Sequence, residues 1–555
     1  MGPDGSGRFR LRTMSAGRRF SDSAQQVKSG ASLSVISVLD AAPTRATIPG
    51  ELGPAESLDG RRLRGGRRLH VPSSWPLLVV LAVQAALSIR LVWANTAFQD
   101  EALYLRAGHL EWANWLHGAA LPDFPSYFSG APVIYPPMAA LVDSVGGLAA
   151  ARALSLVFML GVTTLLWATS RRLFGQRAAL LAAGLFATLA GTQFLGAFAT
   201  YDAMALFLLA LAAWVAVRST DCTFRVRAAL LLTAAVILAL ADAVKYATAL
   251  FTPVVVVVTA LTVVRKQSLR SALLEAATLL GFWLAVVTAE IVAAGHQYWL
   301  GITASTLERP PADVRASLVL QRSYVWTSLI LVLALLGTLL ALRSKDRGRL
   351  LPAVLTAAGL LVPAEQMRLH TTVGLPKHVV FGAWFAAIAA GYAMARLSRV
   401  DPGRGWAPVM ALPIAASTLF GSIGQADALY SVWPNSARVM SVIRSALHTH
   451  PGNYLAEDYD VEAYYLRKEV PWQRWSSTYY FSYPGEGSGA AAYAAAISRH
   501  YFSLVILDFG DTAATDRKLS ADMALAGGYH VLTRAGRFTV WVPDVPNQSA
   551  AGRQQ

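Results

Sequence analysis

Long apolar runs, separated by short polar or basic stretches, follow one another along the chain from about residue 75. Each run approaches the roughly 20 residues that a helix needs to cross about 30 Å of hydrocarbon. The pattern therefore predicts an α-helical polytopic membrane protein with about eleven transmembrane helices. The predicted spans cover residues 75–95, 148–169, 178–198, 202–217, 228–243, 247–264, 272–294, 324–342, 350–364, 378–395 and 406–423.

Composition changes near both ends divide the chain further. Residues 1–72 are rich in Gly, Ser, Ala and Arg with little apolar periodicity, which indicates a disordered basic tail. The membrane domain is expected over 73–428. Short alternating runs such as "YFSLVILDF" and "YHVLTRAGRFTVWV" predict a small α/β domain over 429–545. Residues 546–555 are expected to be a second disordered tail.

The loop between the first two predicted spans, 96–147, is far longer than a turn. Its segment "YLRAGHLEWANWLHG" has the pattern of an amphipathic helix whose tryptophans suit a membrane interface. Pro136 and Pro137 break any helix there, and the apolar stretch that follows is too short to span. We expect two interfacial helices in this loop.

Basic residues occupy every second loop, which fixes the expected orientation because short cytoplasmic loops keep positive charge. The N-terminus is therefore predicted to be cytoplasmic and the C-terminal α/β domain extracytoplasmic, in a multi-pass protein of the cell membrane. The clusters that carry this prediction are Arg61, Arg62, Arg64, Arg67 and Arg68; Arg171, Arg172 and Arg177; Arg218, Arg225 and Arg227; Arg265, Lys266 and Arg270; Arg343, Lys345, Arg347 and Arg349; and Arg396, Arg399 and Arg404.

Composition agrees with a membrane protein: of 555 residues, 55% are hydrophobic and 15% charged. The net charge of +15 lies in the tail and the cytoplasmic loops, so it is better explained by membrane topology than by a nucleic-acid partner. The single cysteine, Cys222, excludes an intrachain disulfide.

Charged side chains gather near the predicted outer ends of several helices. Asp100 and Glu101 follow the first span, Asp202 opens the fourth, and Asp242 with Lys245 closes the fifth. Such groups are costly beside hydrocarbon and usually mark a function. A transporter would be expected to place them near the midplane.

Four segments in this order resemble the GT-C superfamily of membrane glycosyltransferases: "FQDEALYLRAGH", "YPPM", "TYDAMALFLLALAAW" and "ADAVKYATALFTPVVVV". The chain looks most like the protein O-mannosyltransferase and aminoarabinose-transferase branch, of glycosyltransferase family 39 type, over roughly residues 75–425. The resemblance implies a GT-C fold and transfer of a sugar from a polyprenyl-phosphate donor on the far side of the membrane. The acceptor is left open between a protein, a cell-wall glycan and a lipid.

The resemblance also assigns roles to the carboxylates. It makes Asp100 the base that takes the acceptor's proton and Asp202 a second active-site carboxylate, while Glu101 would orient the acceptor or share a metal. The alternative is that all three residues are helix caps at the interface. No cofactor is required by the pattern. A divalent ion at Asp100 and Glu101 is left open.

A donor phosphate calls for cations, and "EQMRLHTTVGLPKHVV" is the richest cationic segment. We expect Arg368, His370, Lys377 and His378 to bind the phosphate, although Lys377 and His378 could merely extend to the interface. Lys245 and Tyr246 would reach the phosphate or the sugar, unless Lys245 only neutralises Asp242 three residues earlier.

Tyr135 departs from the related enzymes, which tend to carry lysine before the two prolines. This departure shifts the expected phosphate contact from Tyr135 toward residues 368–378. In the outer domain, Glu457, Asp458 and Asp460 are expected to form a solvated helix start. Two other functions stay open: a lipid or glycan transporter, and a membrane anchor for an external sensor or assembly domain.

Overall fold

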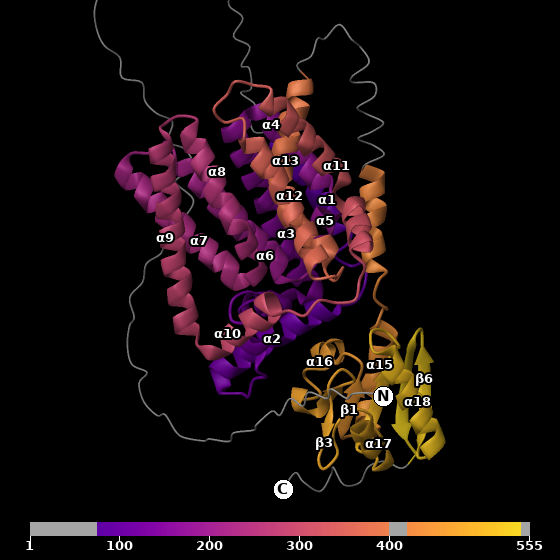
Figure 1. Cartoon of the computed structure of the whole chain (residues 1–555). Helices are drawn as coiled ribbons and strands as arrows, with labels where there is room; N and C mark the ends of the chain where they lie inside the picture. The colour runs from indigo at the N-terminus through magenta and orange to yellow at the C-terminus, as the bar shows by residue number, and fades with distance from the viewer. Residues whose placement is uncertain (1–74, 399–418, 545–555) are drawn as a thin grey trace, which may run out of the picture. The chain divides into compact units, whose positions relative to one another are not determined.

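A computed structural model describes residues 75–398 and 419–544 of the chain, with long helices in the first part and a sheet in the second. Figure 1 colours the chain by residue number, from indigo in the first helices to yellow in the C-terminal sheet. Seven helices among the described residues are long and apolar enough to cross a membrane. The expected class, a helical polytopic membrane protein with a small C-terminal α/β domain, is confirmed.

The helices of the membrane part lie close to the predicted spans, and the first outer loop contains two more helices, α2 and η1. In chain order they are α1 (Trp75–Ile89), α2 (Gln99–His117), η1 (Phe124–Ser126), α3 (Tyr135–Phe174), α4 (Gln176–Thr188), α5 (Ala190–Leu195), α6 (Tyr201–Ser219), α7 (Phe224–Val244), η2 (Tyr246–Phe251), α8 (Thr252–Val264), α9 (Leu269–Ala294), α10 (His296–Ile302), η3 (Thr303–Leu307), α11 (Ala316–Leu342), α12 (Leu351–Arg368) and α13 (Leu375–Leu397).

Two predicted spans differ in detail from the observed helices. The first span ends as a helix at Ile89, so α1 has only 15 residues. The third is broken at Leu189, whose extended backbone (ψ 140°) separates α4 from α5. Residues 406–418 of the predicted span 406–423 lie outside the described residues, and its last part belongs to a helix over 419–430.

The expected second helix of the first outer loop forms the first part of α3 and begins at Tyr135. The backbone of Gly146 and Gly147 is not helical, so a kink separates this part from the long helix that ends at Phe174. Gly147 has φ 65° there, a left-handed conformation that glycine adopts without a Cβ clash. The kink therefore joins the expected interfacial segment directly to the span at 148–169.

Small residues let α13 pack at the centre of the bundle. A Cβ on Gly391 would lie 2.4 Å from the Ala178 carbonyl oxygen of α4, and one on Gly382 would lie 2.7 Å from the Ala358 oxygen of α12. Such close backbone approach is typical of helix packing in membranes, where small side chains replace the hydrophobic driving force. The packing holds the start of α13, and the charged residues there, between neighbouring helices.

The C-terminal domain is a mixed sheet with helices. Its central sheet has the order β2-β1-β5-β7-β6, in which β1 pairs in parallel with β2 and β5 while β7 pairs antiparallel with β5 and β6. The elements are α15 (Ala437–Thr449), β1 (Asn453–Ala456), α16 (Asp460–Tyr465), η4 (Trp472–Arg474), β2 (Trp475–Ser477), β3 (Ser482–Tyr483), β4 (Gly487–Ser488), α17 (Ala490–Ser498), β5 (Phe502–Leu507), α18 (Ala513–Ala526), β6 (Tyr529–Ala535) and β7 (Phe538–Pro543).

Both faces of the sheet are covered, because β5 is buried along its whole length. Leu504 and Ile506 pack into one apolar cluster with α15, whereas Val505 and Leu507 pack into another with α17 and α18. Successive side chains of β5 point to opposite faces of the sheet and thus contribute to two hydrophobic cores. The domain is held by these cores without a disulfide.

Polar contacts tie the C-terminal domain to the first loop. Arg106 of α2 forms an ion pair with Asp460. Tyr464 donates to Asp143 of α3 at 2.5 Å, and His109 of α2 lies 2.6 Å from the other oxygen of the same carboxylate. Contacts near both ends of α16 therefore fasten it to α2 and α3.

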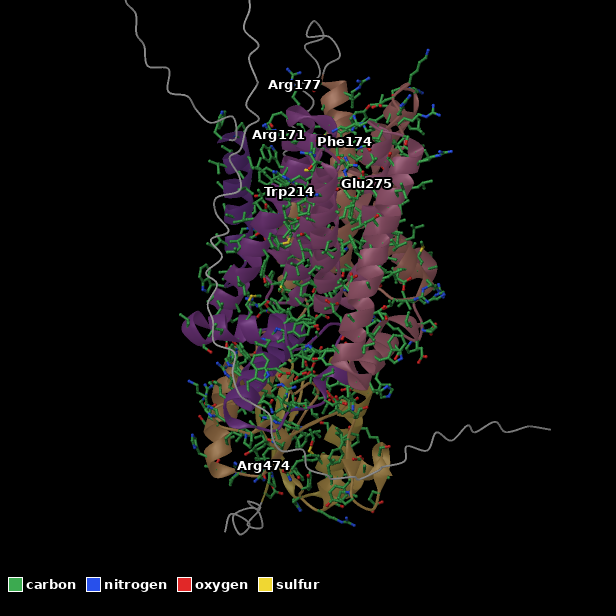
Figure 2. All side chains as sticks on the ribbon, turned by 90° about the vertical axis from the view of Figure 1, so that its left-hand side faces the viewer. Arg171, Phe174, Arg177, Trp214, Glu275 and Arg474 are labelled. Atoms are coloured by element: carbon green, nitrogen blue, oxygen red, sulfur yellow. The ribbon has the colours of Figure 1, made fainter. Side chains whose placement is uncertain are left out.

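The basic clusters among the described residues lie at the end of the helices away from α2, whereas the cluster at 61–68 and Arg399 and Arg404 lie outside the described residues. Figure 2 shows Arg171 and Arg177 at one end and Arg474 of the C-terminal domain at the other. Asp221 pairs at that first end with Arg172 and Lys266, so the cluster includes some compensating charge. The separation of the two kinds of end agrees with the alternation seen in the sequence.

Candidate active site

Charged residues from four helices meet in one continuous row. Asp100 forms an ion pair with Lys377, whose Nζ also lies 3.9 Å from Asp202. Asp202 Oδ1 forms an ion pair with Lys245 Nζ at 2.8 Å, and Lys245 Nζ lies 3.2 Å from His378 Nε2. Two carboxylates therefore alternate with two ammonium groups, and an imidazole ends the row.

Helix ends bring these side chains together. Asp100 and Asp202 lie in the first turns of α2 and α6, where the positive end of the helix dipole favours a carboxylate. Lys245 ends α7. Gly374, at φ 67°, turns the chain into α13 just before Lys377 and His378. The local sequence thus determines where each helix begins or ends, and the packing of the helices determines that these ends meet.

The two carboxylates of the row differ in access. The side chain of Asp100 is 29% exposed, whereas that of Asp202 is fully buried. Asp202 also accepts from the Thr200 hydroxyl at 2.9 Å. Asp100 is therefore the carboxylate of the row that a ligand in solvent can reach, whereas Asp202 lies within ion-pair distance of both lysines.

Aromatic rings flank the same row. Lys245 Nζ lies 4.8 Å from the centroid of the Tyr201 ring, and Tyr201 packs on Tyr104 of α2 at 4.5 Å between centroids. Lys377 faces Phe198 at 6.0 Å. These rings were not singled out from the sequence, although Tyr201 adjoins Asp202 in the motif "TYDAMA". Both ammonium groups thus lie within cation–π distance of a ring.

Glu101 has a different environment from its neighbour Asp100. Its Oε1 accepts from Arg152 Nε and from the Ala199 amide, both at 2.8 Å. Its Oε2 accepts from Arg152 at 2.7 Å and from the Phe98 amide at 3.0 Å. The side chain is fully buried. With both oxygens engaged, Glu101 is placed to lock the start of α2 rather than to contact an acceptor or a metal.

Arg152, the partner of Glu101, was not predicted from the sequence as a site residue. Besides Glu101, its guanidinium donates to three carbonyl oxygens of the segment after α1, those of Val92, Asn95 and Thr96. The signal that could have found it is an arginine inside the apolar run 148–169, which demands a buried partner. Arg152 thus braces the backbone that carries Asp100.

Two cavities adjoin the row on either side. The first, of about 580 Å³, exposes Lys245, Tyr246 and His378 together with Arg309 and Arg368, and its other walls are largely apolar. The second, of about 530 Å³, exposes Asp100 and Lys377 with Arg322 and Trp326. We call them the Lys245 cavity and the Asp100 cavity.

The other expected site residues lie in several places. Arg368 lines the Lys245 cavity but already holds Glu365 with two hydrogen bonds of 2.6 and 2.8 Å. His370 has φ 48° and lies 3.1 Å from the Val314 oxygen, and it lines neither cavity. Tyr135 is fully buried at the start of α3 and also lines neither.

The proposed neutralisation of Asp242 by Lys245 is wrong. Lys245 ends its helix in an extended conformation and turns to Asp202 instead. Asp242 accepts from Thr248 at 2.6 Å and from Trp283 at 2.8 Å. Sequence spacing favoured the ion pair only because it assumed that the helix continues through Lys245.

A metal at Asp100 and Glu101 gains no support from the geometry of Glu101. In the part of the chain that the structure describes, the three carboxylates close enough to share an ion are Glu457, Asp508 and Asp516 of the C-terminal domain. Their oxygens accept from backbone amides of residues 509, 510 and 512, so they close the loop after β5. Glu457 is buried, which corrects its expected place in a solvated helix start.

Comparison with known proteins agrees with this architecture. Residues 132–292 match the family model described as dolichyl-phosphate-mannose-protein mannosyltransferase. No curated protein sequence matches the chain.

Solved structures extend the likeness over most of the chain. ArnT from Cupriavidus metallidurans bound to undecaprenyl phosphate superposes with a TM-score of 0.57 at 14% identity, covering 85% of this chain and 98% of that one. The oligosaccharyltransferase of Archaeoglobus fulgidus in the apo form gives 0.55 at 12% identity, covering 86% and 76%. The archaeal oligosaccharyltransferase AglB of the same organism, with an inhibitory peptide and a dolichol-phosphate, gives 0.51 at 14% identity, covering 85% and 75%.

The chain therefore shares its fold with these membrane proteins over most of its length, and residues 132–292 resemble the mannosyltransferase family.

Proposed function

We propose that the protein transfers a sugar from a polyprenyl-phosphate donor to a hydroxyl group of an acceptor. The observation that carries the proposal is the position of Asp100, a partly exposed carboxylate in an ion-paired row between two cavities. One cavity offers cations and apolar walls, and the other offers the carboxylate. This is the arrangement that transfer from a lipid phosphate needs.

The Lys245 cavity fits the donor. Its apolar lining includes Leu250, Phe251 and Phe381, which suit the first isoprene units of a lipid. Lys245, His378 and Arg309 face the same space and suit the phosphate. In support, ArnT was solved with undecaprenyl phosphate and AglB with a dolichol-phosphate.

The Asp100 cavity then holds the acceptor. The acceptor oxygen forms a bond to the anomeric carbon while the bond from that carbon to the phosphate oxygen breaks. Asp100 takes the proton of the acceptor hydroxyl, and the polyprenyl phosphate leaves with both electrons of the broken bond. Lys245 and Lys377 stabilise the charge that develops on the leaving phosphate.

Lys377 couples the two cavities. Lys377 forms an ion pair with the Asp100 carboxylate in this structure. A donor phosphate competes with Asp100 for Lys377 and would leave the carboxylate free to accept a proton. Asp202, buried beneath both lysines, keeps them within reach of the phosphate.

The orientation belongs to the same proposal. With residues 1–72 and the basic loops in the cytoplasm, the row and the domain 429–545 lie on the outer face of the membrane. The sugar and the acceptor class, whether protein, cell-wall glycan or lipid, are set by contacts in the two cavities.

The test compares wild type with Asp100→Asn in nanodiscs, using radiolabelled polyprenyl-phosphate mannose and membrane-extracted lipid-linked sugars as donors. We expect wild type to release label from the lipid and Asp100→Asn to retain it. The matched control is Asp123→Asn, an exposed aspartate of the same loop, which should behave as wild type. Equal retention of label in all three proteins, over the full donor pool, would favour the transporter or membrane-anchor function.

A further inference from the structure

A third cavity, of about 270 Å³, lies between the start of α2 and the C-terminal domain. Ala97, Phe98 and Gln99 form one wall, and residues of α16 and of the loop after β5 form another. The connector residues Trp433 and Pro434 complete it. We call it the acidic cavity because of the side chains described next.

Carboxylates dominate the lining. Five acidic residues and one basic residue line the acidic cavity. The basic residue, Arg537, forms an ion pair with Asp508 at 2.8 Å. The acidic residues are Glu457, Asp458, Glu462, Asp508 and Asp511. Such an excess of one sign in a confined space focuses a negative potential and favours a cation.

Glu462 gives the strongest evidence that the acidic cavity is a ligand site. Its side chain is 4% exposed, and its Oε2 has no hydrogen-bond partner. Oδ2 of Asp458 is likewise buried without a partner. Burial raises the pKa of Glu462 to about 8, and burial beside Asp460 raises that of Asp458. An unpartnered buried carboxyl oxygen costs free energy, and a cation bound beside Glu462 would stabilise its ionised form.

The acidic cavity continues into the proposed acceptor site. It shares Phe98, Gln99, Trp433 and Asp511 with the Asp100 cavity, so the two adjoin. Gln99 is the residue directly before Asp100. A molecule that places one group in the acidic cavity can therefore also reach the Asp100 carboxylate with another group.

Aromatic residues border the other side. Tyr479 lines both the acidic cavity and a cavity of about 590 Å³ on the sheet domain, where Tyr480, Phe481 and Tyr493 also lie. The Tyr479 hydroxyl donates to Asp511 at 3.1 Å. Carboxylates next to exposed rings are the usual surroundings of a bound ammonium or guanidinium group.

We propose that the acidic cavity binds a positively charged side chain, lysine or arginine, of a polypeptide acceptor whose hydroxyl group lies at Asp100. This inference rests on the proposed function and narrows its acceptor. The charge of the cavity disfavours phosphorylated acceptors, and the match to a protein mannosyltransferase model favours a polypeptide over a glycan.

Binding is tested first, without donor or turnover. Full-length protein in nanodiscs is titrated with n-butylammonium, with n-butanol as the neutral probe of similar size, and binding is followed by saturation-transfer NMR. We expect n-butylammonium to bind and n-butanol to bind at least about tenfold more weakly, as loss of a charge-assisted contact implies. Equal binding of the two probes would overturn the proposal.

Variants locate the binding. Glu462→Gln and Asp511→Asn should each reduce n-butylammonium binding, and Asp511 is exposed, so its substitution leaves the fold intact. Glu486→Gln makes the same change of charge elsewhere on the domain and should bind as wild type. Unchanged binding in both cavity variants would overturn the proposal. So would displacement of n-butylammonium by stoichiometric Ca²⁺, which would make the cavity an inorganic cation site.

The acceptor is tested with two serine peptides that differ only by lysine or norleucine beside the serine. We expect the lysine peptide to have about a tenfold lower KM, and that advantage to shrink in Asp511→Asn. Equal KM values would overturn the polypeptide part, and a preference for a glucosamine glycan would do the same. If neither peptide nor glycan is modified while n-butylammonium still binds, the proposed transferase function fails separately.

Discussion

The ion-paired row at the helix ends and the acidic cavity of the C-terminal domain differ in how their charged groups are paired. In the row, Asp100, Lys377, Asp202 and Lys245 alternate, so each buried charge has a partner of opposite sign. In the acidic cavity, carboxylates outnumber cations and Glu462 has none. Buried charges are stable when paired, so the row is complete by itself, whereas the cavity calls for a ligand.

The largest effect should come from removing the base of the row. Asp100→Asn keeps the size of the side chain but cannot accept the proton, and we expect transfer to fall about 10²- to 10⁴-fold. Single-turnover transfer with saturating donor measures the chemical step. A fall confined to the donor KM would instead make Asp100 a binding residue.

Removing one partner of the buried lock should mainly affect stability. Arg152→Met leaves Glu101 buried and unpaired, and we expect a loss of about 3–5 kcal/mol of unfolding free energy. Thermal unfolding in detergent measures it. Arg172→Met breaks the exposed pair with Asp221 and should cost less than about 1 kcal/mol. Equal effects would show that burial does not distinguish the two pairs.

Within the row, Lys245 should act on donor binding. Lys245→Met removes a phosphate contact and leaves Asp202 with Lys377 alone, so we expect the donor KM to rise about 10- to 100-fold. Steady-state kinetics across donor concentrations measure this, with Lys468→Met, an exposed lysine, as the control. An unchanged KM would remove Lys245 from the donor site.

The smallest effect concerns the unpaired carboxyl of the cavity. The pKa of Glu462 is raised from 4.5 to about 8 by burial, so its protonated form is the one the fold favours. Stability from this group is present below pH 4.5 and is lost as the pH rises through 8. We expect Glu462→Gln to melt a few degrees above wild type at pH 8.5, with a smaller gap at pH 5. A gap independent of pH would contradict this explanation.

The sequence predicted most of the helices because hydrocarbon requires apolar runs of fixed length. It also predicted that Asp100, Asp202, Lys245, Lys377 and His378 would lie near one end of the bundle, and the structure brings these five together. It could not foresee that Arg368 would be held by Glu365, or that His370 and Tyr135 would line neither cavity.

The hydropathy pattern alone determined which charged residues lie near the ends of the membrane helices, because a charge inside hydrocarbon is costly unless it has a partner. It could not determine the partner, because that depends on which helix ends pack together. Only the tertiary structure decided that Lys245 pairs with Asp202 instead of Asp242, and that adjacent Asp100 and Glu101 face a cavity and a buried arginine. Neighbours in a helix point about 100° apart, so two carboxylates with the same sequence context reach different surroundings.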